Sequence, residues 1–239
     1  MPVATMVAPG DVRDLAQAVE DMGFDYIVAW DHVLGADVSY HTPWAGPDTL
    51  VPIHEPFVLF GFLAACTRRV GLTAVIGLPQ RQTALVAKQA AEVDVLTEGR
   101  LRLGVALGWV APEFEALNED FSTRGRRVEE QIDLLRALWT QAVVDFDGDR
   151  HRVDHLGISP LPVQQPIPIW IGGHAQASLR RVAPSKAANR PPARRYRIRS
   201  PRPLRPAGLN CHASAATPRR VLSEPSPGRP ISAAIVRIW

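Results

Sequence analysis

Two short segments of this sequence join chemically useful residues to the end of an apolar stretch. Asp31 and His32 follow YIVAW, and a histidine can take up or release a proton near neutral pH. Gly172 and Gly173 follow IWI and precede a helix-like stretch. Free N–H groups at a helix start, reached through small residues, bind anions such as phosphate. The first segment therefore indicates proton transfer, or alternatively a capping aspartate beside a surface histidine, and the second indicates anion binding.

A third segment, LGVALGW, combines glycines with an aromatic residue. Gly104 and Gly108 let the backbone approach a ligand closely, and Trp109 can form the wall of a pocket. Tight packing between a strand and a helix explains Gly104 equally well. Glu113 lies one helical turn further along and can face either the pocket or solvent.

Other reactive residues lack the pattern that their chemistry needs. His151 and His155 form an H-x-x-x-H pair on a predicted hairpin without a third ligand, so we interpret both as surface residues and predict no metal site. Cys66 and Cys211 have neither zinc-binding nor redox spacing. The sequence contains no nucleophile elbow, no dinucleotide-binding glycine motif and no P-loop.

The useful segments are positioned by an alternation of predicted strands and helices. Strand-like apolar stretches cover residues 2–9, 24–30, 70–79, 100–109 and 166–173, and helix-like stretches cover residues 12–22, 55–66, 83–96, 128–139 and 175–183. A hairpin that turns at Asp147 and Gly148 is predicted at residues 143–153. Nearly continuous apolar strands indicate a parallel sheet buried on both faces. The pattern allows an open doubly wound sheet or a (β/α)8 barrel, which usually needs about 250 residues.

The chain changes character near Pro184. Residues 184–239 hold 12 of the 27 Lys and Arg residues, a single acidic residue and 10 of the 22 prolines. This segment carries a net charge of +11, whereas residues 1–183 carry −8. We therefore predict an α/β domain of about five βα units over residues 1–183. A disordered, low-complexity tail is predicted over residues 184–239.

Four segments carry a family resemblance. They are GFDYIVAWDH at residues 23–32, AKQAAEVDVLTEGRLRLGVALGWVAPEFEAL at 87–117, RGRRVEEQIDLLRALW at 124–139 and PIWIGG at 168–173. Together they resemble the luciferase-like monooxygenase superfamily, and most of all its actinobacterial coenzyme F420-dependent oxidoreductases. The resemblance covers nearly all of residues 1–183. It implies a (β/α)8 TIM-barrel fold, incomplete here because the three further βα units of the family do not follow residue 183.

The resemblance also implies roles for the residues at the strand ends. His32 would exchange a proton beside the deazaflavin ring, and Asp31 would bind the ring or its tail. The residues themselves leave open that Asp31 instead orients a neighbour or bonds locally. Ala74 and Val75 would form a bulge with a cis peptide bond behind the ring. The other cofactor-binding residues that it implies are Gly108 and Trp109 in the pocket wall, and Gly172 and Gly173 at the phosphate. An insertion loop at residues 32–56 would cover the mouth of the barrel, at the carboxyl ends of its strands, with Tyr40, His41 and Trp44 as lid residues.

The resemblance implies hydride transfer between coenzyme F420 and a small organic substrate. Two alternatives remain, namely an FMN-dependent monooxygenase and a non-functional truncated fragment. The N-terminus lacks a basic segment before its apolar stretch, so we predict no signal peptide, and the longest apolar run is too short to span a bilayer. We therefore expect a cytoplasmic protein without a membrane partner, and a homodimer in intact relatives.

The basic tail has two interpretations of its own. The chain contains 25 Arg but only two Lys residues, which suggests a GC-rich gene, and a reading-frame slip in such a gene yields Arg, Pro, Ala and Ser codons. Residues 184–239 would then be an out-of-frame translation, and the alternative is a genuine disordered linker. Nucleic-acid binding is not expected, because the charges are scattered among prolines and only Tyr196 and Trp239 could stack on bases.

Overall fold

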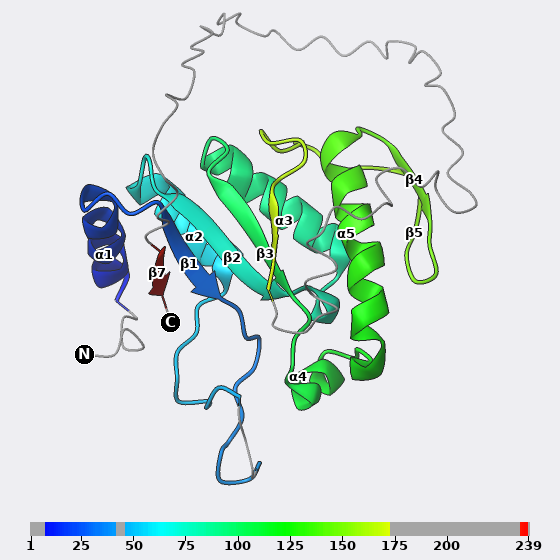
Figure 1. The fold of residues 1–239 in the computed structure, drawn as a ribbon, viewed down its shortest axis with the longest axis horizontal. Helices are drawn as coiled ribbons and strands as arrows, with labels where there is room; N and C mark the ends of the chain where they lie inside the picture. The colour runs from blue at the N-terminus through cyan, green and yellow to red at the C-terminus, as the bar shows by residue number, and fades with distance from the viewer. Residues whose placement is uncertain (1–7, 42–45, 173–234, 239) are drawn as a thin grey trace, which may run out of the picture. The chain divides into compact units, whose positions relative to one another are not determined.

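A parallel β-sheet forms the centre of the protein in this computed structural model, which describes residues 8–41, 46–172 and 235–238 (Figure 1). Within these residues, five strands pair in the order β6-β3-β2-β1-β7. Their bounds are β1 (Tyr26–Trp30), β2 (Gly71–Gly77), β3 (Leu101–Ala106), β6 (Ile169–Ile171) and β7 (Ile235–Ile238). The strands β1, β2, β3 and β6 join the sheet one beside the next in chain order, as successive strands of a (β/α) barrel do.

Helices connect these strands and cover one face of the sheet. They are α1 (Pro9–Asp21), α2 (Pro56–Cys66), α3 (Thr83–Leu96), α4 (Ala111–Ala116) and α5 (Arg124–Thr140), with 3-10 turns η2 (Leu78–Gln80) and η3 (Phe121–Thr123). Figure 1 shows α2 and α3 behind the sheet. Of these helices, α1 packs against α2, α2 against α3, and α3 against α5. Trp139 joins α5 to α3, because its indole N–H donates to the carbonyl of Ala87 at 3.0 Å.

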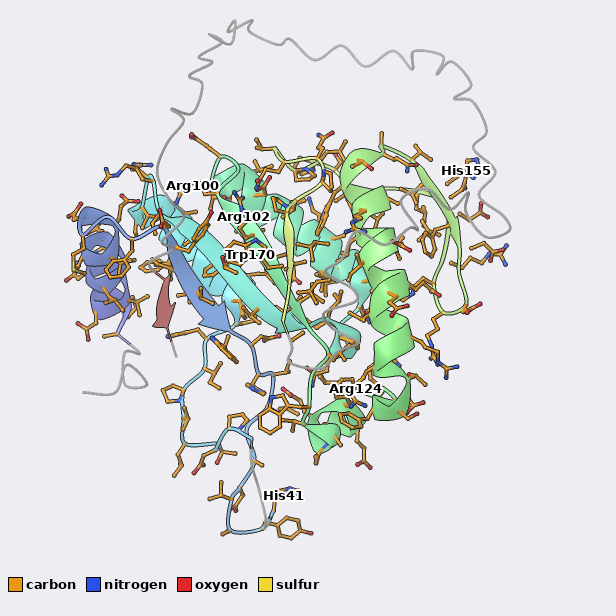
Figure 2. The ribbon with its side chains drawn as sticks, in the orientation of Figure 1. His41, Arg100, Arg102, Arg124, His155 and Trp170 are labelled. Carbon is orange, nitrogen blue, oxygen red and sulfur yellow. The ribbon has the colours of Figure 1, made fainter. Side chains whose placement is uncertain are left out.

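The two faces of the sheet differ because side chains alternate along each strand. Ile27, Leu72 and Leu101 are register partners, and all three are fully buried in the core that the helices share. We call the opposite face, which the helices do not cover, the inner face. It is more polar and more exposed than the face that packs against the helices. Figure 2 shows Arg102 and Trp170 on this side of the sheet, away from α2 and α3. The Trp170 ring meets the Tyr26 ring edge-on, with 5.1 Å between centroids.

A β-hairpin and a long loop precede β6. The hairpin pairs β4 (Val144–Asp147) with β5 (Arg152–Leu156), which confirms the predicted hairpin. Its turn lies at residues 148–151 and not at Asp147 and Gly148, because Asp147 still pairs with Arg152. The loop that follows is anchored by Asp94, which is fully buried in α3. Its carboxylate accepts hydrogen bonds from the backbone N–H of Gln164 at 2.8 Å and from the Gln164 side chain at 2.6 Å.

The structure differs from the sequence-based expectation in the part of the tail that it describes, residues 235–238. Residues Ile235–Ile238 form β7, which pairs in parallel with β1, whereas the sequence predicted a tail without regular structure. Three of the four residues in the local sequence IVRI are apolar and β-branched, a composition suited to a strand. The predicted strand at residues 2–9 mostly lies outside the described residues. So do the predicted helix at 175–183 and the rest of the tail.

Candidate active site

The predicted site segments converge at the carboxyl ends of neighbouring strands. Because β1, β2, β3 and β6 are parallel and adjacent, the residues that follow them lie along one edge of the sheet. This edge contains Asp31 and His32 after β1, Gly108 and Trp109 after β3, and Gly172 after β6. Residues far apart in the sequence therefore lie together at the carboxyl end of the sheet. We call this end the mouth and treat it as the candidate active site. Gly173 lies outside the described residues.

Asp31 points into the protein and is bound by Arg81. Its carboxylate accepts two hydrogen bonds from the Arg81 guanidinium, at 2.6 and 2.9 Å, and its side chain is only 2% exposed. Burial raises the pKa of Asp31, and the bonds from Arg81 work against this rise. Arg81 also reaches Glu55, at 3.1 Å. This geometry corresponds to the local bonding that the residues themselves left open for Asp31 beside the cofactor-binding role that the resemblance implied.

His32 occupies the mouth itself. Its Nδ1 lies 3.3 Å from a carboxylate oxygen of Glu113, and its side chain is 16% exposed. The imidazole meets the Trp109 ring edge-on, with 6.1 Å between centroids and 89° between planes. A titratable ring is thus held between a carboxylate and an aromatic wall.

Glu113 is the residue that sequence reasoning left undecided between pocket and solvent. Its carboxylate is 2% exposed and accepts hydrogen bonds from the backbone N–H groups of Val33 at 2.6 Å and Leu34 at 3.2 Å. The Gln80 amide adds a bond of 2.8 Å. Burial alone would raise the pKa of Glu113, but the bonds from His32, Gln80 and the two backbone groups outweigh burial and lower it. Glu113 therefore ties together the ends of β1, β2 and β3.

The turn after β3 requires Gly108 for two reasons. Its φ of +74° is unfavourable for other residues, and a Cβ atom there would lie 2.7 Å from the Phe114 ring. The turn presents Trp109, which is 54% exposed, on the rim of the mouth. The glycine therefore allows close packing and directs the adjacent aromatic side chain outward.

The expected cis peptide bond between Ala74 and Val75 is wrong. In the described chain, the cis bonds precede Pro160 and Pro166. Ala74 and Val75 instead continue β2 with regular pairing to β1 and β3 on both sides, which leaves no room for a bulge. Ala74 is fully buried in the helix-side core, whereas Val75 is half-buried on the inner face.

At the end of β6, the backbone N–H of Gly172 donates to the carbonyl of Val105 at 2.8 Å. This group is therefore occupied by the sheet, so any anion site in this loop depends on residues further along. Those residues, including Gly173, lie outside the described part of the chain.

The two hairpin histidines have different surroundings. His151 is not a free surface residue, since Nδ1 lies 2.6 Å from Glu130 and Nε2 lies 2.7 Å from the Thr83 hydroxyl. His155 is exposed, as predicted, and lies beside Asp145 and Asp154. The ligand atoms of these three exposed residues lie within 4.8 Å of one another. Exposed acidic groups are common without an ion, so this cluster alone indicates no metal site.

The predicted lid loop extends away from the sheet. Figure 2 shows His41 near its far end. Tyr40 is 82% exposed and its ring meets the His41 ring edge-on, at 5.1 Å. Trp44 lies outside the described residues.

The inner face beside the mouth suits a flat aromatic ligand. Trp30, Val75, Gly104 and Trp170 form one register row across it, and each tryptophan is 38% exposed. A Cβ on Gly104 would lie 2.8 Å from the Val75 side chain, so this glycine leaves space that the valine uses. The residues of this row are apolar, and Gly104 near its centre has no side chain. His32 and Trp109 lie on the adjoining rim. These residues fit the ring of a flavin or deazaflavin.

Comparison with known proteins assigns the chain to a family. The family model described as luciferase-like monooxygenase matches residues 2–185. The chain belongs to this family. It is 36% identical over 176 residues to an uncharacterized protein of Mycobacterium tuberculosis, covering 71% of this chain and 61% of that one.

Curated relatives of this luciferase-like chain differ in cofactor. An FMNH2-dependent dimethylsulfone monooxygenase of Pseudomonas putida is 34% identical, over 70% of this chain and 44% of the relative. An F420-dependent glucose-6-phosphate dehydrogenase of Nakamurella multipartita is 30% identical, over 74% of this chain and 50% of the relative. The chain thus spans between about two fifths and three fifths of the length of these relatives.

Solved structures show the same fold. A riboflavin lyase matches with a TM-score of 0.63 and 20% identity, over 72% of this chain and 44% of that one. An F420-dependent secondary alcohol dehydrogenase matches with a TM-score of 0.56 and 22% identity, over 69% and 48%. The sheet and helices of this chain therefore form part of a luciferase-like TIM barrel. Among the described helices, each is too short or too polar to cross a bilayer.

Proposed function

We propose that this protein is an F420-dependent oxidoreductase that acts on a small organic substrate. The observation that carries the proposal is the mouth formed by His32, Trp109 and the apolar inner row, in a chain of the luciferase-like family. Support for F420 in particular comes from the resemblance of the sequence to that subgroup and from the F420-dependent relative. When bound, a deazaflavin supplies a ring carbon that accepts or donates a hydride.

The residues of the chain would bind, orient and exchange protons. Val75 and the two tryptophans of the inner row would support the ring, and Trp109 would cover its edge. His32 would take up or release the proton that accompanies hydride transfer, because it is the titratable ring on the rim. Asp31 would act indirectly by holding Arg81 and the strand end in place. Gly172 and Gly173 stay candidates for the phosphate-binding loop.

A flavin-dependent monooxygenase is the second candidate. The observation that favours it is the FMNH2-dependent relative, which is somewhat more similar to this chain than the F420-dependent one. The same apolar row would hold a flavin ring equally well, so the geometry described above does not distinguish the two cofactors.

The test is a titration of the purified chain with F420 and, separately, with FMN in its oxidised and reduced forms. Cofactor fluorescence and calorimetry would measure binding. We expect F420 to bind more tightly than either form of FMN, and Trp109→Ala to weaken F420 binding. Tighter binding of FMN would reverse the choice of cofactor. Failure to bind any of them would refute the proposal for this chain.

A matched control keeps the titration specific. Val143→Ala removes an exposed apolar side chain far from the mouth in the sequence, next to the β4–β5 hairpin. Its affinity for cofactor should equal that of the unmodified protein. An equal loss in Val143→Ala and Trp109→Ala would show that the effect is not local to the mouth.

A further inference from the structure

We propose that Glu113 fixes the proton of the neutral His32 ring on Nδ1, which leaves Nε2 as the nitrogen that exchanges a proton with a ligand. This inference deepens the proposed function and rests on it for its catalytic meaning. The arrangement of donors and acceptors can be tested without any ligand. Glu113 is thus a positioning residue that acts through His32.

The first step is the count of donors around the Glu113 carboxylate. One oxygen receives the backbone N–H groups of Val33 and Leu34, and the other receives the Gln80 amide and faces Nδ1 of His32. An ionised carboxylate can only accept hydrogen bonds. Nδ1 must therefore carry the hydrogen in the 3.3 Å contact.

The ionised state of Glu113 follows from the same contacts. Burial disfavours the charged form, but the bonds from His32, Gln80, Leu34 and Val33 together lower the pKa of Glu113 below its usual value. A carboxylate that accepts several N–H bonds keeps its charge even when little of it is exposed. Glu113 thus remains an acceptor at neutral pH.

The second step concerns the other ring nitrogen. Among the described residues, His32 Nε2 has no hydrogen-bond partner, whereas the side chain stays 16% exposed on the rim. With the hydrogen on Nδ1, Nε2 carries a lone pair and can accept a proton. Among the described residues, the charged groups linked to this arrangement are Glu113 from α4, which faces His32, and Asp31, which interacts with Arg81, Glu55 and Glu113.

The third step explains why a buried carboxylate would be used for this purpose. Glu113 holds the backbone of Val33 and Leu34, the two residues after His32, with the same group that faces the ring. The orientation of the ring and the path of the backbone are therefore set together. Hydrogen bonds that fix the tautomer and orientation of a histidine are a common device at catalytic sites.

The decisive measurement is the nitrogen NMR spectrum of the full chain labelled with 15N-histidine, without ligand and near pH 8. His32→Gln would identify the signals of His32. We expect Nδ1 of His32 to show the shift of a protonated nitrogen and Nε2 the shift of a nitrogen with a lone pair. A proton on Nε2, or an even mixture of the two tautomers, would overturn the inference.

A pair of variants tests whether Glu113 is the cause. In Glu113→Gln, the side-chain oxygen can still accept from Val33 and Leu34, but the new amide donates toward Nδ1 and should move the hydrogen of His32 to Nε2. Glu115→Gln, on the exposed side of the same short helix, should leave the His32 spectrum unchanged. An unchanged His32 tautomer in folded Glu113→Gln would remove Glu113 from this role. If that variant does not fold, the spectrum of the unmodified protein alone decides.

Failure of this inference and failure of the proposed function give different results. The predicted tautomer without binding of F420 or FMN would retain Glu113 as the positioning residue and refute the proposed function. Cofactor binding with the hydrogen of His32 on Nε2 would support the proposed function and refute the positioning role of Glu113. In a chain with turnover, Glu113→Gln should lower kcat with little change in KM, and by no more than the factor of about 10²–10⁴ that a general acid–base group such as His32 contributes. A change in KM alone would contradict the positioning role.

Discussion

Asp31 and His32 are neighbours in the chain but have separate roles in the structure. Asp31 turns inward to Arg81 and is nearly fully buried, whereas His32 turns to Glu113 and stays partly exposed on the rim. The alternation of side chains at the end of β1 explains the division, because adjacent residues point to opposite sides. The aspartate thus supports the mouth and the histidine is available for chemistry.

Asp31→Asn should destabilise the protein. The substitution leaves the Arg81 guanidinium, which is 15% exposed, without its charged bidentate partner. Removing one partner of a buried ion pair typically costs about 3–5 kcal/mol in free energy of unfolding. Because Glu55 stays 3.1 Å from Arg81 and burial already disfavours the charge of Asp31, we expect a loss below that range. Urea denaturation would measure the loss. Asp14→Asn, which removes an exposed ion pair with Arg13, should leave the free energy of unfolding almost unchanged, because solvent screens exposed pairs. Equal losses in the two variants would show that the Asp31 pair does not support the fold.

His32→Gln should separate binding from catalysis. Glutamine keeps a polar side chain of similar size but cannot exchange a proton near neutral pH. Once the chain or a relative that contains this segment shows F420-dependent turnover, we expect kcat to fall by about 10²–10⁴ with little change in cofactor affinity. His155→Gln, on the exposed hairpin, is the matched control. Turnover that survives in His32→Gln would assign the proton to another group.

At the scale of elements, buried side chains hold the loop that leads into β2. Glu20, in the last turn of α1, accepts the backbone N–H groups of Arg68, Arg69 and Val70 at 2.6–3.1 Å. Arg100 donates from the other side to the carbonyls of Thr67 and Val70, at 3.1 and 2.7 Å. These contacts satisfy backbone groups at the amino end of the sheet and set where β2 begins.

The Glu20 contacts predict a pH-dependent contribution to stability. Burial disfavours the charge, but the backbone bonds outweigh burial and lower the pKa of Glu20 from its ordinary 4.5. A lowered folded pKa stabilises the protein above the unfolded value, and this contribution is lost as pH falls through the folded value. The difference in melting temperature between the unmodified protein and Glu20→Gln should therefore be largest near pH 7 and shrink below about pH 4.5.

Asp21→Asn is the control for the Glu20 experiment, because this neighbour is 81% exposed and has only a 3.7 Å contact with Arg69. Its melting temperature should stay close to that of the unmodified protein at every pH. A difference for Glu20→Gln that is independent of pH would mean that shape, and not charge, holds the loop.

At the scale of the whole molecule, the described sheet is an arc with two edges, β6 and β7. The chain spans 44–61% of the length of the relatives compared above, so the arc corresponds to part of a barrel. Unpaired strand edges favour association with other chains. On one side of the arc, β7 pairs with β1 from Tyr26 to Ala29 and covers that edge.

Val236→Pro tests whether β7 protects β1. Proline cannot donate a ladder hydrogen bond and is unfavourable within a strand. We expect faster hydrogen exchange of the β1 amides and more aggregation on heating than in the unmodified protein. Val143→Ala, beside the β4–β5 hairpin, is the control. Unchanged exchange in Val236→Pro would show that β1 does not depend on this pairing.

Much of the fold could be predicted from the sequence, because local patterns determine local structure. The apolar stretches at β1, β2, β3 and β6 and the amphipathic stretches at α3 and α5 mark their own elements, and their alternation indicates a parallel sheet. Parallel strands place their carboxyl ends at one edge, so the convergence of His32, Gly108 and Gly172 also follows from the sequence.

Only the tertiary structure shows which residues form hydrogen bonds and ion pairs with one another. Glu113 lies 81 residues from His32, and Arg81 lies 50 residues from Asp31, so no local pattern shows that either pair meets. The regular pairing of Ala74 and Val75 with both neighbouring strands joins separate segments of the chain, and β7 pairs with an edge of β1 more than 200 residues away. The sequence by itself determined the elements and the edge at which they gather, because periodicity is a local property. The hydrogen bonds that assign each side chain its role required the packed structure, because they join segments that are distant in the chain.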